Sequence, residues 1–168
     1  MSQNNNNQTP DRRMYKTLMM TLKERLKTIC IQRLEDKISA FRTIVSDMSA
    51  DAQTDAKSSA GDKHETGLAM MHIEQENLSK KIKENLDILE VVSKIDEKKV
   101  SDKVEFGSVV KINSVTLFFS AALPKIVLDD MSVMAISNDA PIAKELLGRK
   151  LNETFVFNNC EFKVNYIE

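Results

Sequence analysis

Two series of apolar residues at helical spacing occupy the first third of the chain. The first series is Leu18, Leu22, Leu26 and Ile29. The second alternates spacings of three and four and comprises Ile31, Leu34, Ile38, Phe41, Val45, Met48 and Ala52. This alternation predicts a helix with one apolar seam that packs on a partner helix. Because the two series are out of phase at residues 29–31, we expect the buried face to rotate there, or the helix to break.

The partner helix follows in the sequence after a polar interruption at residues 57–67. Its seam is predicted to contain Leu68, Met71, Gln75, Leu78, Ile82, Leu86, Leu89 and Val92. Gln75 is the single polar member and can fix the register of the pair. With a helix start at Thr9-Pro10-Asp11, residues 11–99 are predicted to form a long antiparallel coiled coil whose tip is 57–67.

After Lys98-Lys99 the apolar pattern shortens to strand length. Residues 100–168 are therefore predicted to form a separate α+β domain. The expected strands are 105–112 with a bulge at its glycine, 115–120, 125–128, 131–136, 154–157 and 162–167. A helix is expected over 140–148, with Pro141 at its first position, Asn138 or Asp139 as its cap and Gly148 at its end. Asp129-Asp130 and Asn158-Asn159 are predicted to form turns.

Composition narrows the classes of function. The 168 residues carry a net charge of −1, so any contact with a polyanion must come from a local patch. Two distant cysteines, Cys30 and Cys160, and a polar N-terminus without a signal peptide favour the cytoplasm. Residues 1–10 are asparagine-rich and predicted to be a disordered tail. No apolar run approaches the roughly 20 residues of a membrane span.

The interruption between the helices holds the candidate chemistry. Gly61 can end the first helix, and Asp62 followed by Glu65 matches a variant capping box at the start of the second. A structural role for the two carboxylates is the simpler interpretation, although a capping carboxylate can still face outward. His64 lies between them, but adjacent tip residues rarely satisfy the tetrahedral geometry of a transition-metal site.

Two segments resemble the Gre family of bacterial transcript-cleavage factors. Residues 135–151 (AISNDAPIAKELLGRKL) are similar to the family's Ile-Ser-x-x-Ser-Pro-hydrophobic-Gly-x-x-Leu-Leu-Gly-Lys motif. At the tip, Gly61, Asp62 and Glu65 fall on the glycine and the first two acids of the family's Gly-Asp-Leu-x-Glu-Asn-Ala-Glu-Tyr motif, and Glu74-Gln75 matches the Glu-Gln that follows. The resemblance covers roughly residues 20–168.

The resemblance implies a function that the protein would perform only in complex with RNA polymerase. The family's coiled coil enters the secondary channel of RNA polymerase, and its C-terminal domain, similar to the FKBP fold, docks at the rim. Asp62 and Glu65 would then help to hold a Mg²⁺ ion at the polymerase active site and promote cleavage of backtracked RNA. Lys57 and Lys63 would contact RNA phosphate. Docking would involve the motif residues Pro141, Leu146, Leu147 and Gly148. The isolated protein is expected to be a monomer that binds no metal.

The tip also departs from the family motif. Thr66-Gly67-Leu68-Ala69 replaces Asn-Ala-Glu-Tyr, so Leu68 and Ala69 stand where the family has its third acid and its tyrosine. Ala140 replaces the motif serine, and Ala143 stands where glycine is frequent. Two alternatives therefore remain open. One is a regulator that binds the secondary channel without promoting cleavage, and the other is a coiled-coil interaction or dimerisation protein.

Overall fold

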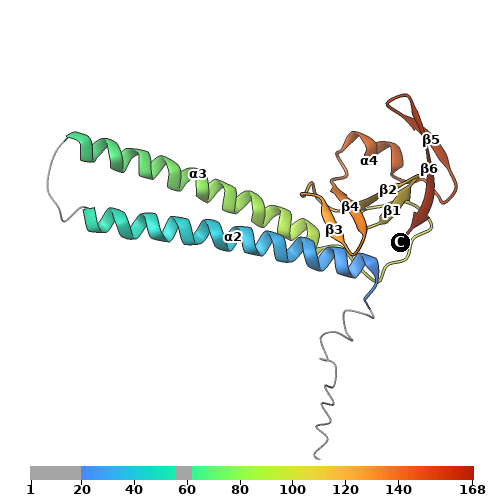
Figure 1. Ribbon diagram of the computed structural model, residues 1–168, viewed down its shortest axis with the longest axis horizontal. Coiled ribbons are helices and arrows are strands. Elements are labelled where there is room, and N and C mark those ends of the chain that lie inside the picture. Colours follow the sequence, from blue (N-terminus) through green and yellow to red (C-terminus); the bar gives the residue numbers. More distant parts are fainter. Residues whose placement is uncertain (1–19, 56–61) are drawn as a thin grey trace, which may run out of the picture.

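The structure, a computed structural model, describes residues 20–55 and 62–168, and for residues 51–55 and 62–64 it describes the backbone alone. Two long helices, α2 (Leu22–Asp55) and α3 (Asp62–Ser93), run side by side in opposite directions and project from a small sheet (Figure 1). The predicted tail, the helix start at residues 9–11, Lys57 and Gly61 lie outside the described residues. The α+β class is confirmed, whereas FKBP similarity, coiled-coil geometry and the domain boundary stay predictions.

The predicted seam is the buried side of α2. From residue 31 to residue 50, the side chains that are not exposed are those of Ile31, Leu34, Ile38, Phe41, Val45, Met48 and Ser49. The helix continues without a break through residues 29–31. Near its start it also buries Leu26 and Cys30, because this end contacts both α3 and the sheet. The first apolar series is therefore out of phase with the second because the start of α2 is buried against both α3 and the sheet.

The seam of α3 differs from the prediction at one position. Leu86 is 39% exposed, and the neighbouring Asn85 is buried in its place. A strict alternation of three and four after Ile82 reaches 85 and then 89, so helical phase outweighs the greater hydrophobicity of leucine. Asn85 Nδ2 donates a 2.7 Å hydrogen bond to the Lys81 carbonyl, which satisfies this buried amide donor locally. Gln75 is half-buried as predicted, and its Nε2 donates to Ser49 Oγ across the helix pair at 3.0 Å.

The C-terminal part is a six-stranded mixed sheet in the order β3-β4-β2-β1-β6-β5. Only the β2–β4 pair is parallel among the strand pairs of the described residues. The strands are β1 (Val109–Ile112), β2 (Val115–Phe119), β3 (Ile126–Leu128), β4 (Met131–Ile136), β5 (Thr154–Phe157) and β6 (Cys160–Ile167). The two-residue turn between β5 and β6 has positive φ at Asn158 and Asn159 (51° and 60°), as expected for the hairpin turn that asparagine favours.

Along β1 and β2, neighbouring residues face two different cores. One core packs the sheet on the base of the helix pair and contains Leu26, Cys30, Leu34, Val92, Ile95, Val109, Phe118, Ala121, Ile126, Val133 and Ala135. The other lies on the opposite face, beneath α4 (Pro141–Leu146), and contains Val104, Val110, Ile112, Leu117, Phe119, Ala143, Leu146, Phe155 and Val164. The adjacent residues Phe118 and Phe119 therefore belong to different cores, because side chains alternate along a strand.

Polar contacts also attach the base of α2 to the rest of the chain. Lys27 Nζ contacts Glu97 Oε2 at 2.7 Å and donates to the Ile95 carbonyl at 2.6 Å. The backbone N–H of Lys23, in the first turn of α2, donates to Glu168 Oε1 at 3.2 Å. Carboxylates near a helix N-terminus are stabilised by the helix dipole. The projecting helices thus have a fixed base.

Two local predictions in the C-terminal part were wrong. The strand expected over 105–112 begins only at Val109, because Gly107 (φ 90°) lies in a turn closed by a 3.0 Å bond from Ser108 N–H to the Glu105 carbonyl. A Cβ at Gly107 would lie 3.1 Å from Ile95 Cγ2, so the glycine serves a turn and a close approach rather than a bulge.

The cap of α4 was the second wrong prediction. Ala140 occupies the N-cap position, with φ −59° and ψ 138°, and no side chain caps the helix. Asn138 and Asp139 precede that position and so are placed too early to act as the cap. Pro141 at the first helical position and Gly148 (φ 82°) just after the helix agree with the prediction.

Candidate functional site

The start of α3, where the tip acids occur in the sequence, lies at the end of the helix pair that is farthest from the sheet (Figure 1). α3 begins at Asp62, so Asp62 and Glu65 both belong to its first turn, and the Glu65 side chain is exposed. Residues three apart on a helix share one face, which brings these two positions together. Lys63 also lies in this turn, whereas Lys57 is outside the described residues. The 34 residues of α2 correspond to roughly 50 Å of helix.

The predicted interruption is shorter than residues 57–67. Gly67 lies inside α3, at an ordinary helical position where an added Cβ would meet no atom within 4 Å. A single glycine inside a helix costs only about 1 kcal/mol relative to alanine, which is too little to end the helix. Both acidic positions therefore belong to regular helix rather than to a loop.

Replacing Gly67 by alanine is expected to stabilise the protein by about 0.5–1 kcal/mol, since glycine in a helix interior loses more backbone entropy on folding than alanine. Urea unfolding followed by circular dichroism at 222 nm measures the change. Leu68→Ala, one residue along and half-buried in the seam, is the matched control and should be destabilising. A loss of stability in Gly67→Ala would contradict the helical position of Gly67.

The acids alone do not make a complete metal site. In the part of the chain that the structure describes, no three His, Cys, Asp or Glu side chains are grouped so that they could hold a metal ion. Mg²⁺ is bound through few carboxylates and keeps several waters, so two acids on one helical turn are a partial ligand set.

The C-terminal motif divides into buried and exposed residues. Leu146 is fully buried in the core beneath α4, so its role is to hold the helix on the sheet. Pro141 is exposed and Leu147 is 38% exposed, which leaves these two side chains available to a partner. The Gly148 N–H donates to the Val104 carbonyl at 2.8 Å, which fixes the chain as it leaves α4.

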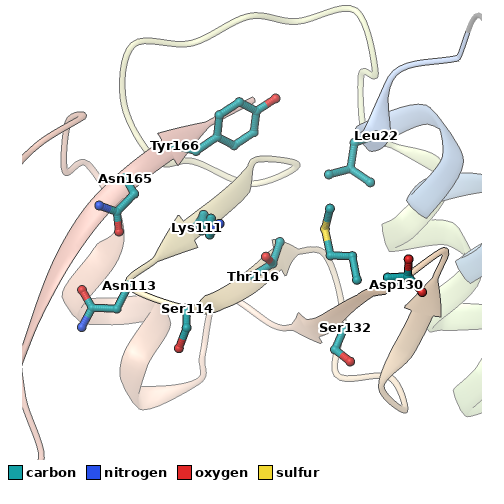
Figure 2. Close-up of a pocket in the computed structure, with 10 residues that line it drawn as sticks. Leu22, Lys111, Asn113, Ser114, Thr116, Asp130, Ser132, Asn165 and Tyr166 are labelled. Carbon is teal, nitrogen blue, oxygen red and sulfur yellow. The ribbon is translucent and has the colours of Figure 1, made fainter.

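Sequence reasoning missed a groove of about 940 Å³ on the sheet, beside the start of α2 (Figure 2). Lys111, Thr116 and Tyr166 line it from three adjacent strands, and Leu22 borders it from the helix. The signal in the sequence was a short polar alternation around the β1–β2 turn, with Lys111 and Asn113 on one side and Ser114 and Thr116 on the other. It could be recognised only once the strand order was known.

The Asn113 and Tyr166 side chains that line the groove are poor candidates for catalysis. Its Asn113 side chain is engaged by Lys163 N–H and by the Glu161 carbonyl, at 3.1 and 3.2 Å. Tyr166 donates its hydroxyl to Glu168 Oε2 at 2.8 Å, and burial together with this carboxylate raises the pKa of Tyr166 to about 12. The phenol is therefore protonated at neutral pH and cannot act as a base. These side chains stabilise the sheet edge.

The two cysteines are expected to react at very different rates. Cys30 is buried in the core at the helix base, and burial raises the pKa of its thiol to about 11, whereas Cys160 is exposed. The thiolate is the reactive form. Labelling with an aromatic disulfide reagent at pH 8 should therefore modify Cys160 rapidly in the native protein, and Cys30 only after unfolding.

Cys160→Ser is the control for this labelling experiment, because it should leave the native protein almost unreactive. Equal rates for both thiols in the native wild type would mean that the helix base opens readily.

No helix among the described residues is both long enough and apolar enough to cross a bilayer. No protein-family model matches this chain, and no curated protein matches it as a relative. The function must therefore be inferred from the placement of the tip acids, the seam and the C-terminal motif.

Proposed function

We propose that the protein is a Gre-like factor that inserts its helix pair into the secondary channel of a bacterial RNA polymerase. There, Asp62 and Glu65 assist Mg²⁺-dependent cleavage of backtracked RNA at the polymerase active site. The observation that carries this proposal is the first turn of α3, which contains Asp62 and the exposed Glu65 at the far end of a long, thin helix pair with a fixed base. The chain is built to present these acids at a distance from its own core.

The chemistry requires that the partner complete the site. In phosphodiester hydrolysis, two metal ions about 4 Å apart stabilise the attacking and the leaving oxygen. Polymerase carboxylates would hold the first ion, and the tip acids would recruit the second with its waters. Lys57 precedes the two acids in the sequence and Lys63 lies between them, and both would neutralise RNA phosphate.

Exposed apolar side chains near the tip agree with insertion into another molecule. Met70 is 69% exposed and Ile73 is 59% exposed, and the two lie three residues apart on α3 shortly after Glu65. Methionine adapts its shape to irregular contacts. A channel wall would bury both side chains next to the acidic turn.

A regulator that occupies the channel without promoting cleavage is the second candidate. Leu68 stands at the family's third acidic position, and it is half-buried at the start of the seam, while Ala69 is exposed where the family has tyrosine. The tip therefore offers one carboxylate fewer than the family motif. Binding would block substrate entry through the channel even if the metal were held too weakly for cleavage.

Dimerisation through the helices is disfavoured because the apolar seams of the two helices already pack on each other. The apolar seam of α2 and the seam of α3 bury each other within one chain, and the Gln75–Ser49 hydrogen bond lies across them. A second copy would have to pack on the outer faces of the helices, which are mostly polar apart from exposed apolar side chains such as Met70 and Ile73. Light scattering that finds a stable dimer at micromolar concentration would favour this third candidate.

The test combines binding and cleavage. The full-length protein should co-purify with core RNA polymerase, and addition to backtracked elongation complexes with Mg²⁺ should release short RNA fragments carrying the 3′ end. Binding without fragments, together with slower nucleotide addition, would establish the non-cleaving regulator instead. Failure to bind polymerase at low salt would overturn both candidates.

A further inference from the structure

A second cleft lies where α3 meets the sheet domain. It has a volume of about 450 Å³, within the range of small-molecule sites. Ile88 and Val91 of α3 form one wall, and Phe106, Ala121 and Ala122 contribute further apolar surface. Polar residues at the ends of β2 and β4 complete the lining. We call this feature the junction cleft.

Two polar atoms in the junction cleft have no hydrogen-bond partner among the residues that the structure describes. They are Ser120 Oγ and Asn138 Oδ1, both buried. Ser120 is only 3% exposed, and its backbone N–H is already used by the Ile136 carbonyl at 2.8 Å. Buried polar groups in proteins are nearly always satisfied, so two unsatisfied atoms in one cleft indicate a missing partner.

The hydrogen-bonding capacity of these two atoms limits which chemical groups the partner can present to them. An amide oxygen only accepts hydrogen bonds, whereas a hydroxyl can accept or donate. The partner must therefore donate at least one N–H or O–H to Asn138 Oδ1. It must also bring an apolar body, because α3 and the loop after β2 line most of the remaining surface.

The charged residues around the junction cleft indicate which sign of charge the partner carries. Asp87 and Asp139 are exposed and contribute to its lining. Of the described residues that line it, none is a lysine or arginine. An anion such as a nucleotide or a carboxylic acid would be repelled here, and a cation would be attracted.

We propose that the junction cleft binds a small organic cation with an apolar body and an amine or amidine group. The cationic N–H groups donate to Asn138 Oδ1 and Ser120 Oγ, with Asp87 and Asp139 supplying the countercharge. The apolar part packs on Ile88, Val91 and Phe106. This site lies on the sheet side of the molecule, and its existence does not depend on the activity of the tip.

Benzamidine is a suitable probe because it combines a planar apolar ring with a cationic group of several N–H donors. Titration of the full-length ¹⁵N-labelled protein should shift the amide signals of residues 88–91, 120–122 and 137–139. The dissociation constant should be on the order of 1 mM for a ligand of this size. Benzamide, which keeps the shape without the charge, should bind about tenfold more weakly, and benzoate should not bind.

Two variants separate the contributions of hydrogen bonding and charge. Ser120→Ala should weaken benzamidine binding about fivefold while leaving the thermal midpoint unchanged or higher, since it removes an unsatisfied buried hydroxyl. Asp87→Asn with Asp139→Asn should abolish the preference for benzamidine over benzamide. Asp130→Asn, in the groove on the sheet, is the matched control and should bind normally.

The proposal is overturned if benzamidine shifts signals elsewhere, if benzoate binds equally well, or if neither variant changes the affinity.

Discussion

Replacing Asp62 and Glu65 together by alanine is expected to abolish the stimulation of transcript cleavage while binding to RNA polymerase is retained. Each carboxylate is proposed to hold the same Mg²⁺ ion, so neither can substitute fully for the other. Metal ions contribute several kcal/mol to such transition states, so losing the ion should lower the cleavage rate by roughly 10²–10³-fold. The measurement is the rate of fragment release from backtracked complexes under saturating protein.

The control must separate metal binding from helix stability, because both acids also lie in the first turn of α3. Carboxylates there stabilise the helix by about 0.3–1 kcal/mol each through the helix dipole. Asp62→Asn with Glu65→Gln keeps the shape and much of the capping capacity but removes the charges, and it should be equally inactive. Glu76→Ala with Glu84→Ala changes the net charge by the same amount on the exposed side of α3 and should remain active.

The metal dependence makes this prediction specific. The single variants Asp62→Ala and Glu65→Ala should recover part of their activity at high Mg²⁺ concentration, because weaker metal binding is offset by mass action. Full cleavage by the double variant would show that the tip acids have only a structural role, as the capping interpretation holds. Loss of polymerase binding in the double variant would place them in the docking interface instead.

Much of the fold follows from periodicity. The seam of α2 agrees with its prediction residue by residue up to Met48, because alternation by three and four leaves one possible buried face. β5 was predicted with the bounds that it has, because Asn158-Asn159 favours a two-residue turn that fixes where the strand stops. Where the local turn residues and the apolar periodicity agreed, the sequence was sufficient to predict the element.

The sequence alone was insufficient at positions whose burial or conformation depends on tertiary packing. Leu86 is the more apolar residue, yet Asn85 has the seam phase and satisfies its donor within the helix. Gly107 was taken as a bulge, because its contact with Ile95, twelve positions earlier, has no local signature. For the same reason the groove and the junction cleft were missed, since their linings combine residues distant in sequence. The tip acids could be identified only through the family motif, because spacing alone also fits a capping box.

Phe118→Ala is expected to destabilise the whole protein by about 3–5 kcal/mol, the usual cost of truncating a fully buried phenylalanine. Phe118 has no exposed surface and lies in the core that joins the sheet to the base of α2 and α3. For a chain of this size, the thermal midpoint should fall by roughly 6–20 °C. Circular dichroism at 222 nm, which reports mainly on the helices, is the measurement because the substitution itself is in a strand.

The position of Phe118 makes its substitution a test of how the helix pair is held. If the helices depend on the shared core, the helix signal must melt earlier in Phe118→Ala, although no helical residue has changed. Phe119→Ala removes the same ring from the other core, beneath α4, and should cost a similar amount, whereas the 65% exposed Val127→Ala should change the midpoint little. A helix transition that stays at its wild-type midpoint in Phe118→Ala would mean that the helices fold independently of the sheet. The base would then not fix the direction in which the tip acids point, and insertion into a narrow channel would lose the rigid support that the packing of Phe118 against the helix base supplies.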